Sequence, residues 1–226
     1  MADRIYFSPS FFSFLNDLKH HNDRDWFNAH KEHFENDVKK SAMEFISDFA
    51  PSLAKISKHF VADPQKSMFR IYRDTRFSKD KSPYKTHVGI QFRHDKGKDA
   101  HTPGFYLHLE PGQVFVGIGI WHPDSTSLTK IRNAIVDDPA AWKRASQGKK
   151  FTSVYSLAGE SLKRPPKGYD PSHKFVTDLM RKDFIASAKL SENTVIQPDF
   201  LEVFAEYCSA GAPFIRFLSN AVEVSF

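Results

Sequence analysis

The stretch Phe105-Tyr-Leu-His-Leu-Glu-Pro-Gly-Gln-Val-Phe-Val-Gly-Ile-Gly-Ile-Trp121 alternates between apolar and other residues on both sides of Pro111-Gly112. Pro followed by Gly predicts a type II turn, because Pro favours the first central position and the second requires a positive φ. Alternate side chains of a strand point to opposite faces of its sheet. The stretch therefore predicts a β-hairpin in which His108 lies opposite Phe115.

The two faces of this hairpin differ in character. One face collects a continuous apolar set that predicts a core: Phe105, Leu107, Leu109, Val114, Val116, Ile118 and Ile120. The other face carries Tyr106, His108, Glu110, Gln113, Phe115, Gly117, Gly119 and Trp121. Glycine inside a strand often marks a close approach by another group. The second face is therefore predicted to be either a binding cleft or a surface covered by a helix or loop.

Neighbouring segments repeat the same alternation. The sequence predicts further strands at 68–73, 87–93, 151–157 and 184–190. In 87–93 the polar face would hold His87, Gly89, Gln91 and Arg93. In 68–73, Phe69 and Ile71 would face the core and leave Arg70 and Tyr72 on the polar face.

Helical signals flank these strands. Ser8-Pro9 predicts a helix start. A second helix is expected from about residue 23, with His30 on its apolar side and a break or kink at Pro51. Later helices are expected at 125–136, 139–147, 173–181, 198–208 and 213–223. This order predicts an α+β fold: a single domain over residues 1–226, with a mostly antiparallel sheet, N-terminal helices on one face and further helices toward the C-terminus.

Composition excludes several classes of protein. The chain has 226 residues, 22 of them Phe, and no apolar run near the ~18 residues of a membrane span. The N-terminus lacks the apolar core of a signal peptide, so a cytoplasmic location without membrane association is expected. Cys208 is the only cysteine, which excludes an intramolecular disulfide, and it is expected to be a buried apolar residue rather than a nucleophile.

The positive charge of the chain is concentrated between Arg70 and His87. This stretch holds six Arg and Lys residues against two Asp residues, a net charge of +4, whereas the whole chain carries +5. Arginine presents a planar fork that suits carboxylate and phosphate groups. An anion site and a solvated charged loop are both compatible with this pattern. Aromatic residues between the cations could stack on bases, but no recognisable nucleic-acid-binding motif is present.

Four blocks of the sequence carry a family resemblance: 70–87, 104–112, 117–123 and Leu162-Lys-Arg-Pro-Pro-Lys-Gly168. Together they resemble the family labelled domain of unknown function 2461, and the resemblance covers most of the chain. It implies a soluble, single-domain, cytoplasmic protein of a mainly bacterial and fungal group. It brings no activity, substrate or catalytic residue with it.

These observations lead to one principal functional hypothesis and two alternatives. The first is that an anionic or phosphorylated small molecule binds on the polar sheet face, with His108 and Glu110 as acid–base candidates. Its ligand-binding residues would be Arg70, Tyr72, Arg73, Arg76, Lys85, His87, Tyr106 and Trp121. The second is an interaction module that docks an acidic protein or nucleic acid through the basic loop 73–87.

The third hypothesis is a metal-dependent enzyme built on His108-x-Glu110. A third histidine would be needed to imitate a two-His-one-carboxylate site: His87, His122 or His173. A His-x-Glu pair is a weak signal among 11 histidines, so the sequence alone assigns no metal ligand and identifies no cofactor.

Overall fold

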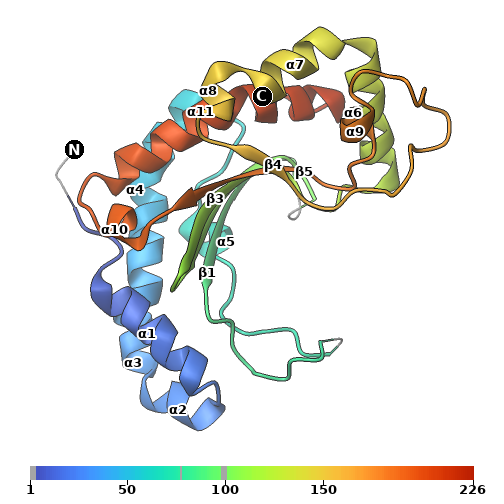
Figure 1. Cartoon of the computed structure of the whole chain (residues 1–226). Helices are drawn as coiled ribbons and strands as arrows, with labels where there is room; N and C mark the ends of the chain where they lie inside the picture. Colours follow the sequence, from blue (N-terminus) through green and yellow to red (C-terminus); the bar gives the residue numbers. More distant parts are fainter. Residues whose placement is uncertain (1–3, 77, 98–100) are drawn as a thin grey trace.

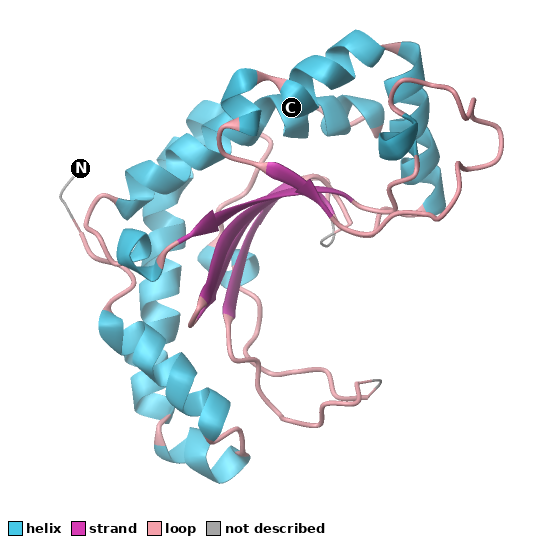
Figure 2. Cartoon of the chain, in the orientation of Figure 1, coloured by secondary structure: helices cyan, strands magenta, loops and turns pink. Residues whose placement is uncertain are grey.

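A five-stranded antiparallel sheet forms the centre of the computed structural model, which describes residues 4–76, 78–97 and 101–226. Its strand order is β1-β2-β3-β5-β4. The strands are β1 Val88–Arg93, β2 Gly104–Glu110, β3 Gln113–Ile120, β4 Ser156–Ala158 and β5 Phe184–Leu190. Helices cover one face of this sheet and its upper edge, as Figures 1 and 2 show. The α+β class and the antiparallel sheet predicted from the sequence are confirmed.

The N-terminal helices are α1 Pro9–His20, α2 Arg24–Ala29, α3 Lys31–His33, the π-helical turn η1 Phe34–Lys39, α4 Lys40–Ile56 and α5 Pro64–Ser67. Pro9 occupies the first turn of α1, and the Ser8 side chain accepts a hydrogen bond from the Phe11 N–H. The break considered at Pro51 does not occur, because Pro51 lies inside α4, which continues to Ile56. The prediction for His30 is wrong: its side chain is exposed and stacks on Trp26 instead of entering the core.

The later helices are α6 Ser125–Asp137, α7 Pro139–Gln147, α8 Lys149–Thr152, α9 Val176–Leu179, α10 Glu192–Val195 and α11 Phe200–Ala221. The helices expected at 125–136 and 139–147 are confirmed, the first with Asp124 as its N-cap. The helix expected at 173–181 is only the short α9.

Two further segments correct the sequence predictions. The two helices expected at 198–208 and 213–223 are one continuous helix, α11, with Pro213 inside it. Pro51 and Pro213 both lie on exposed sides of their helices, where the packing of the buried sides outweighs one lost backbone hydrogen bond. The strand expected at 151–157 is wrong in its first half, because Phe151 belongs to α8 and only β4 is extended.

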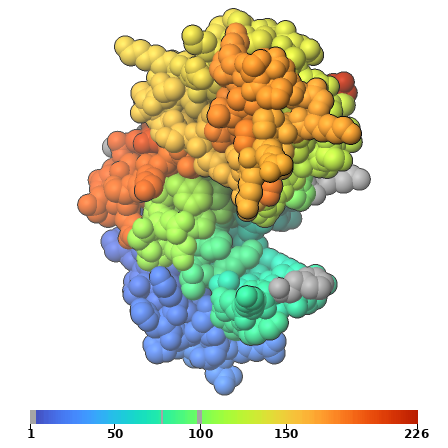
Figure 3. Space-filling model, turned by 45° about the vertical axis from the view of Figure 1, so that its right-hand side comes forward, coloured from blue at the N-terminus to red at the C-terminus, as the bar shows by residue number. Residues whose placement is uncertain are grey.

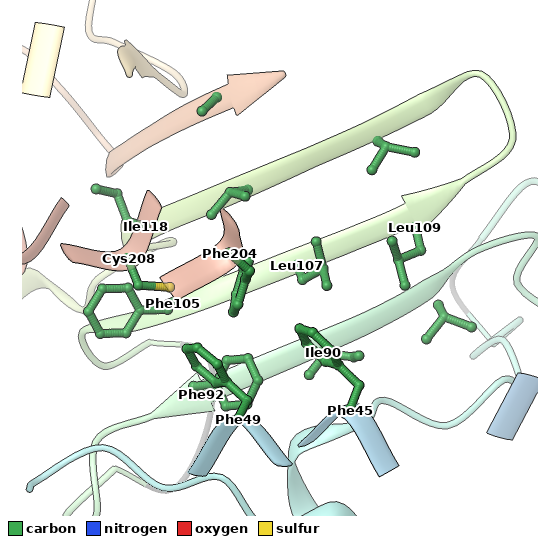
Figure 4. Close-up of a cluster of buried hydrophobic side chains, with 14 of the residues drawn as sticks. Phe45, Phe49, Ile90, Phe92, Phe105, Leu107, Leu109, Ile118, Phe204 and Cys208 are labelled. Atoms are coloured by element: carbon green, nitrogen blue, oxygen red, sulfur yellow. The ribbon is translucent and has the colours of Figure 1, made fainter. Parts of the chain in front are cut away.

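The hairpin β2–β3 has the predicted register. His108 pairs with Phe115 and Glu110 pairs with Gln113, and Gly112 has a φ of 80°. The predicted apolar face is buried against α4 and α11, and Figure 4 shows the rings of Phe49 and Phe204 over it. Burial of this face against large aromatic side chains from both helices stabilises the fold.

The segment expected as a strand at 68–73 is irregular. It makes only isolated bridges, between Met68 and Ile90 and between Tyr72 and Tyr84. Ile71 is buried as predicted, but Phe69 is 40% exposed. The Phe69 N–H donates to the carbonyl oxygen of Gly89, and without a regular ladder its ring turns to the polar side of β1.

The other side of the sheet is concave. It opens between the loop that precedes β1 and the loop between β4 and α9 (Figure 1), and the molecular surface is hollowed there between the teal and orange segments (Figure 3). Cys208 is buried in the core, where burial raises the pKa of its thiol, as expected for a structural cysteine. Within the described residues, no helix has the length and apolarity needed to cross a membrane.

Candidate functional site

One row of side chains crosses all five strands on the concave face. Directly paired residues of adjacent strands point to the same face of a sheet. The pairings join Gln91 to Tyr106, Tyr106 to Gly117, Gly117 to Ser187 and Ser187 to Ser156. The row therefore places an amide, a phenol, a bare glycine and two hydroxyls side by side in the middle of the sheet.

A pocket of about 460 Å³ lies over this row. The exposed rings of Phe69 and Trp121 lie among its walls, and Gly117 forms part of its floor. The remaining lining residues are Gln91, Gly104, Tyr106, Phe115, Ile118, Gly119, Ile185, Ala186 and Ser187. A mostly apolar and aromatic lining with a few polar groups is typical of small-molecule sites.

Gly89 makes room for one wall of the pocket. A Cβ at this position would lie 2.6 Å from the Tyr106 hydroxyl oxygen and 3.1 Å from the Phe69 ring. The absence of a side chain therefore lets the Tyr106 ring lie across β1 toward its hydrogen-bond partner. The close approach that in-strand glycines predict is found here, and the approaching group is a side chain of the neighbouring strand.

The Tyr106 hydroxyl connects the pocket to a polar network beside it. It lies 3.0 Å from His108 Nδ1, and His108 Nε2 lies 3.3 Å from Glu110 Oε2. Thr86 donates its hydroxyl proton to the other oxygen of Glu110 at 2.9 Å. His108 also stacks on Phe115, with ring centroids 4.6 Å apart, so its orientation is fixed from three sides.

His87 completes this network without a hydrogen bond to any described residue. Its ring lies 4.5 Å from that of His108, centroid to centroid. Suitable ligand atoms of His87, His108 and Glu110 all lie within 4.8 Å of one another. Of the three histidines that the sequence offered as partners of His108 and Glu110, the structure brings His87 to them; His122 instead pairs with Asp183.

The environment of these groups sets their protonation. Burial, and next the neighbouring His108, lower the pKa of His87 to about 4. Burial also lowers the pKa of His108, although the hydrogen bond and charge of Glu110 oppose this. Burial raises the pKa of Glu110, but the hydrogen bonds from Thr86 and His108 outweigh it and leave that pKa lowered. At neutral pH the network thus holds two neutral imidazoles and one carboxylate.

Comparison with known protein families agrees with the motifs in the sequence. Residues 10–217 match the family described as "Conserved hypothetical protein (DUF2461)". The chain belongs to the DUF2461 family. A search of curated proteins found no significant match. Family membership assigns no reaction to this DUF2461 protein, so its function has to be argued from the site itself.

The arginines expected at the site lie elsewhere in this DUF2461 chain. Arg73 forms an ion pair with Asp80 at 3.0 Å, and Arg76 forms one with Asp74 at 2.7 Å. The side chain of Arg70 is exposed. None of the three lines the pocket over the sheet, because the segment that carries them leaves the sheet edge after Phe69.

Tyr72 and Arg73 belong to a separate pocket of about 440 Å³, between α2 and the basic loop. Its lining residues are Arg24, Asn28, Tyr72, Arg73, Thr75, Lys81, Pro83 and Tyr84. Lys85 lies nearer the sheet, with its ammonium nitrogen 5.5 Å from the centre of the Phe69 ring. The structure thus brings together His87, Tyr106, His108, Glu110 and Trp121 on the concave face, with Lys85 at its rim.

Phe69, Gln91 and Ser187 are among the lining residues that the sequence did not assign to the site. Gln91 was placed on the correct face by alternation but carried no chemical signal of its own. Ser187 lies on β5, and no local pattern indicates that β5 pairs with β3 across about 70 residues of chain. Phe69 was assigned to the core because the alternation was extended into a segment that is not a strand.

Proposed function

We propose that the pocket on the concave sheet face binds a small molecule with a planar, largely apolar body and an anionic end. The aromatic lining of the 460 Å³ pocket carries the proposal, since its volume falls in the usual range for small ligands. Phe69 and Trp121 would contact the planar body from the walls of the pocket. Gln91 and Ser187 would supply hydrogen bonds that fix its orientation.

The anionic end would lie toward Lys85. The Lys85 ammonium donates to the carbonyl oxygen of Arg70 at 3.0 Å, which leaves two of its three N–H donors for a ligand. Burial, and then Arg70 and Arg73, lower the pKa of Lys85, so an anion beside it would be favoured electrostatically. The positive charge predicted for the site would thus come from one lysine at the rim.

The test uses 8-anilinonaphthalene-1-sulfonate, a planar anion whose fluorescence rises in apolar sites. Trp121→Ala should weaken its binding about tenfold, or about 1.4 kcal/mol, because the substitution removes an aromatic ring from the pocket wall. The variant should still fold, since half of the Trp121 surface is already exposed. Val136→Ala is the matched control, since Val136 is another partly exposed apolar residue outside the pocket. Equal affinity for both variants would exclude this pocket as the site.

The same assay extends to natural ligands. Phosphorylated and carboxylated metabolites that displace the probe from the wild type should lose affinity for Lys85→Met, which keeps the length and apolar stem of the side chain. A metabolite that binds wild type and Lys85→Met equally would contradict the placement of the anionic end.

Docking of an acidic protein or nucleic acid on residues 73–87 is the second function that the sequence predicts. Lys81 donates to the carbonyl oxygen of Thr75, and Arg73 and Arg76 form their ion pairs within the loop. These internal contacts partly neutralise the charge that docking would use. Among the described residues, no contact favours this second function over the pocket.

A further inference from the structure

We propose that His87, His108 and Glu110 form a binding site for a divalent transition-metal ion. Two imidazoles and one carboxylate are a ligand set used by zinc and by non-haem iron sites. His87 directly precedes β1, and His108 and Glu110 project from one face of β2. None of the three lines the pocket described above, so the inference stands apart from the ligand proposal.

The spacing of the ligand atoms fits an ion. Metal–ligand bonds of about 2.1 Å place adjacent ligand atoms roughly 3.0–3.4 Å apart in octahedral or tetrahedral geometry. His108 Nε2 and Glu110 Oε2 already lie 3.3 Å apart. The third ligand, His87, lies within 4.8 Å of both and makes no hydrogen bond to a described residue, so its ring is free to turn toward the ion.

The surroundings supply the outer shell that metal sites require. Metal-bound histidines are normally held by a hydrogen bond at the second ring nitrogen, and bound carboxylates by one at the second oxygen. Tyr106 provides the first for His108 at Nδ1, and Thr86 provides the second for Glu110 at Oε1. Nε2 and Oε2 are directed at each other, and an ion between them would replace only the hydrogen bond from His108 to Glu110. The His108 proton would then lie on Nδ1 and be donated to the Tyr106 hydroxyl oxygen.

A second cluster in the molecule shows what a non-binding arrangement looks like. His59, His94 and Asp95 also gather within 4.8 Å. However, His94 Nδ1 accepts from the Lys96 N–H at 3.1 Å, and Nε2 lies 2.7 Å from the carbonyl oxygen of Ser225, to which it must donate. Its one lone pair is therefore used, and His94 cannot ligate an ion without breaking this structure.

Three protein ligands leave coordination positions open. Phe115 stacks on His108 and lines the pocket, and Tyr106 contacts both, so the ion would lie immediately beside the pocket. An open position on a metal ion is the arrangement of catalytic rather than structural sites. Such an ion could bind water or a substrate oxygen at the open position, and this binding would allow the site to take part in a reaction.

The experiment uses the full chain without a histidine tag, stripped with a chelator and titrated with Zn²⁺ and with Co²⁺. The wild type should bind one equivalent with a dissociation constant below about 10 μM, gain thermal stability, and give the visible absorption of Co²⁺ with nitrogen and oxygen ligands. Anaerobic titration with Fe²⁺ and Mn²⁺ then ranks the ions.

The variants are chosen to keep the fold. His87→Gln removes a ring that makes no hydrogen bond to any described residue, and Glu110→Gln keeps an oxygen that can accept the Thr86 hydrogen bond, so both variants should fold. Because each variant lacks one proposed ligand, each should bind Zn²⁺ at least tenfold more weakly. His59→Gln, in the second cluster, should bind as the wild type does. Unchanged affinity in both ligand variants, or no ion bound by the wild type at 100 μM, would overturn the proposal.

Discussion

At the residue scale, two glycines of β3 separate a structural requirement from a functional one. Gly119 has a φ of 119°, and a Cβ there would lie 2.0 Å from the carbonyl oxygen of Phe184. At Gly117 a Cβ would meet its nearest neighbour, Tyr106 Cδ1, at an ordinary 3.4 Å. The first glycine allows β3 and β5 to pair, whereas the second leaves the pocket floor bare.

Alanine substitution should separate these roles. We expect Gly119→Ala to lower the free energy of unfolding by about 3 kcal/mol or more, since both φ and the β5 backbone oppose a side chain. Gly117→Ala should change it by less than about 1 kcal/mol. Urea unfolding followed by circular dichroism measures both, and equal losses would show that Gly117 is also a structural requirement.

The lowered pKa of His87 predicts a pH dependence of stability. Its pKa is 6.5 in an unfolded chain and about 4 in the folded protein. Between these values the unfolded chain takes up a proton that the folded protein does not, so the free energy of unfolding should fall as the pH falls through this window. The lowered pKa of His108 acts in the same direction.

Unfolding in urea at pH 7 and pH 4.5, with a chelator present, measures this effect. His87→Gln should lose less stability than the wild type between the two pH values, because it lacks the titrating ring. His20→Gln, an exposed histidine at the end of α1, is the control. A wild-type slope in His87→Gln would contradict the pKa shift.

At the scale of elements, the sheet is held by the two long helices α4 and α11. The Phe204 ring on α11 has its centroid 4.8 Å from that of Phe49 on α4 and 5.7 Å from that of Phe92 on β1. One side chain thus joins three elements that are far apart in the sequence. The continuity of α4 and α11 through their prolines follows from this packing.

Truncation of that ring should be costly. Phe204→Ala should lower the free energy of unfolding by about 3–5 kcal/mol, because the cavity lies where α4, α11 and β1 meet and none of them can collapse into it alone. Val203→Ala, one residue earlier on the partly exposed side of α11, should cost about 1 kcal/mol. Thermal or urea unfolding compares the two, and similar losses would contradict this role for Phe204.

At the scale of the whole molecule, the N-terminal helices, the sheet and the C-terminal helices share one hydrophobic core. A shared core predicts a single cooperative unit, as the sequence also led us to expect for residues 1–226. Three tryptophans sample different regions: Trp26 in α2, Trp121 after β3 and Trp142 in α7.

Two double variants make this prediction testable. Replacing two tryptophans by Phe leaves either Trp26 or Trp142 as the only tryptophan. In each of the two proteins, the urea midpoint measured by tryptophan fluorescence should equal the midpoint measured by circular dichroism. A fluorescence midpoint that differs from the circular dichroism midpoint of the same protein would instead indicate two independently folding parts.

The sequence was most informative where one local rule decided the outcome. The register of β2–β3 followed from Pro111-Gly112 and the period of two, and the start of α1 followed from Ser8-Pro9. Predictions failed where tertiary packing overrode a local signal. The chain stays helical through Pro51, and the segments 198–208 and 213–223 belong to one helix, α11. His30 is exposed, and Phe69 turns to the polar face because its segment forms no ladder.

By itself the sequence determined the fold class, the hairpin and the two unlike faces of the sheet, because side-chain alternation and turn chemistry are local properties of the chain. Only the tertiary structure decided which residues meet on the concave face. It moved the arginines of 70–76 away from the sheet, brought Ser187 beside Gly117 and placed His87 against His108 and Glu110. Those encounters depend on strand order and loop path, which arise from long-range packing that no local spacing records.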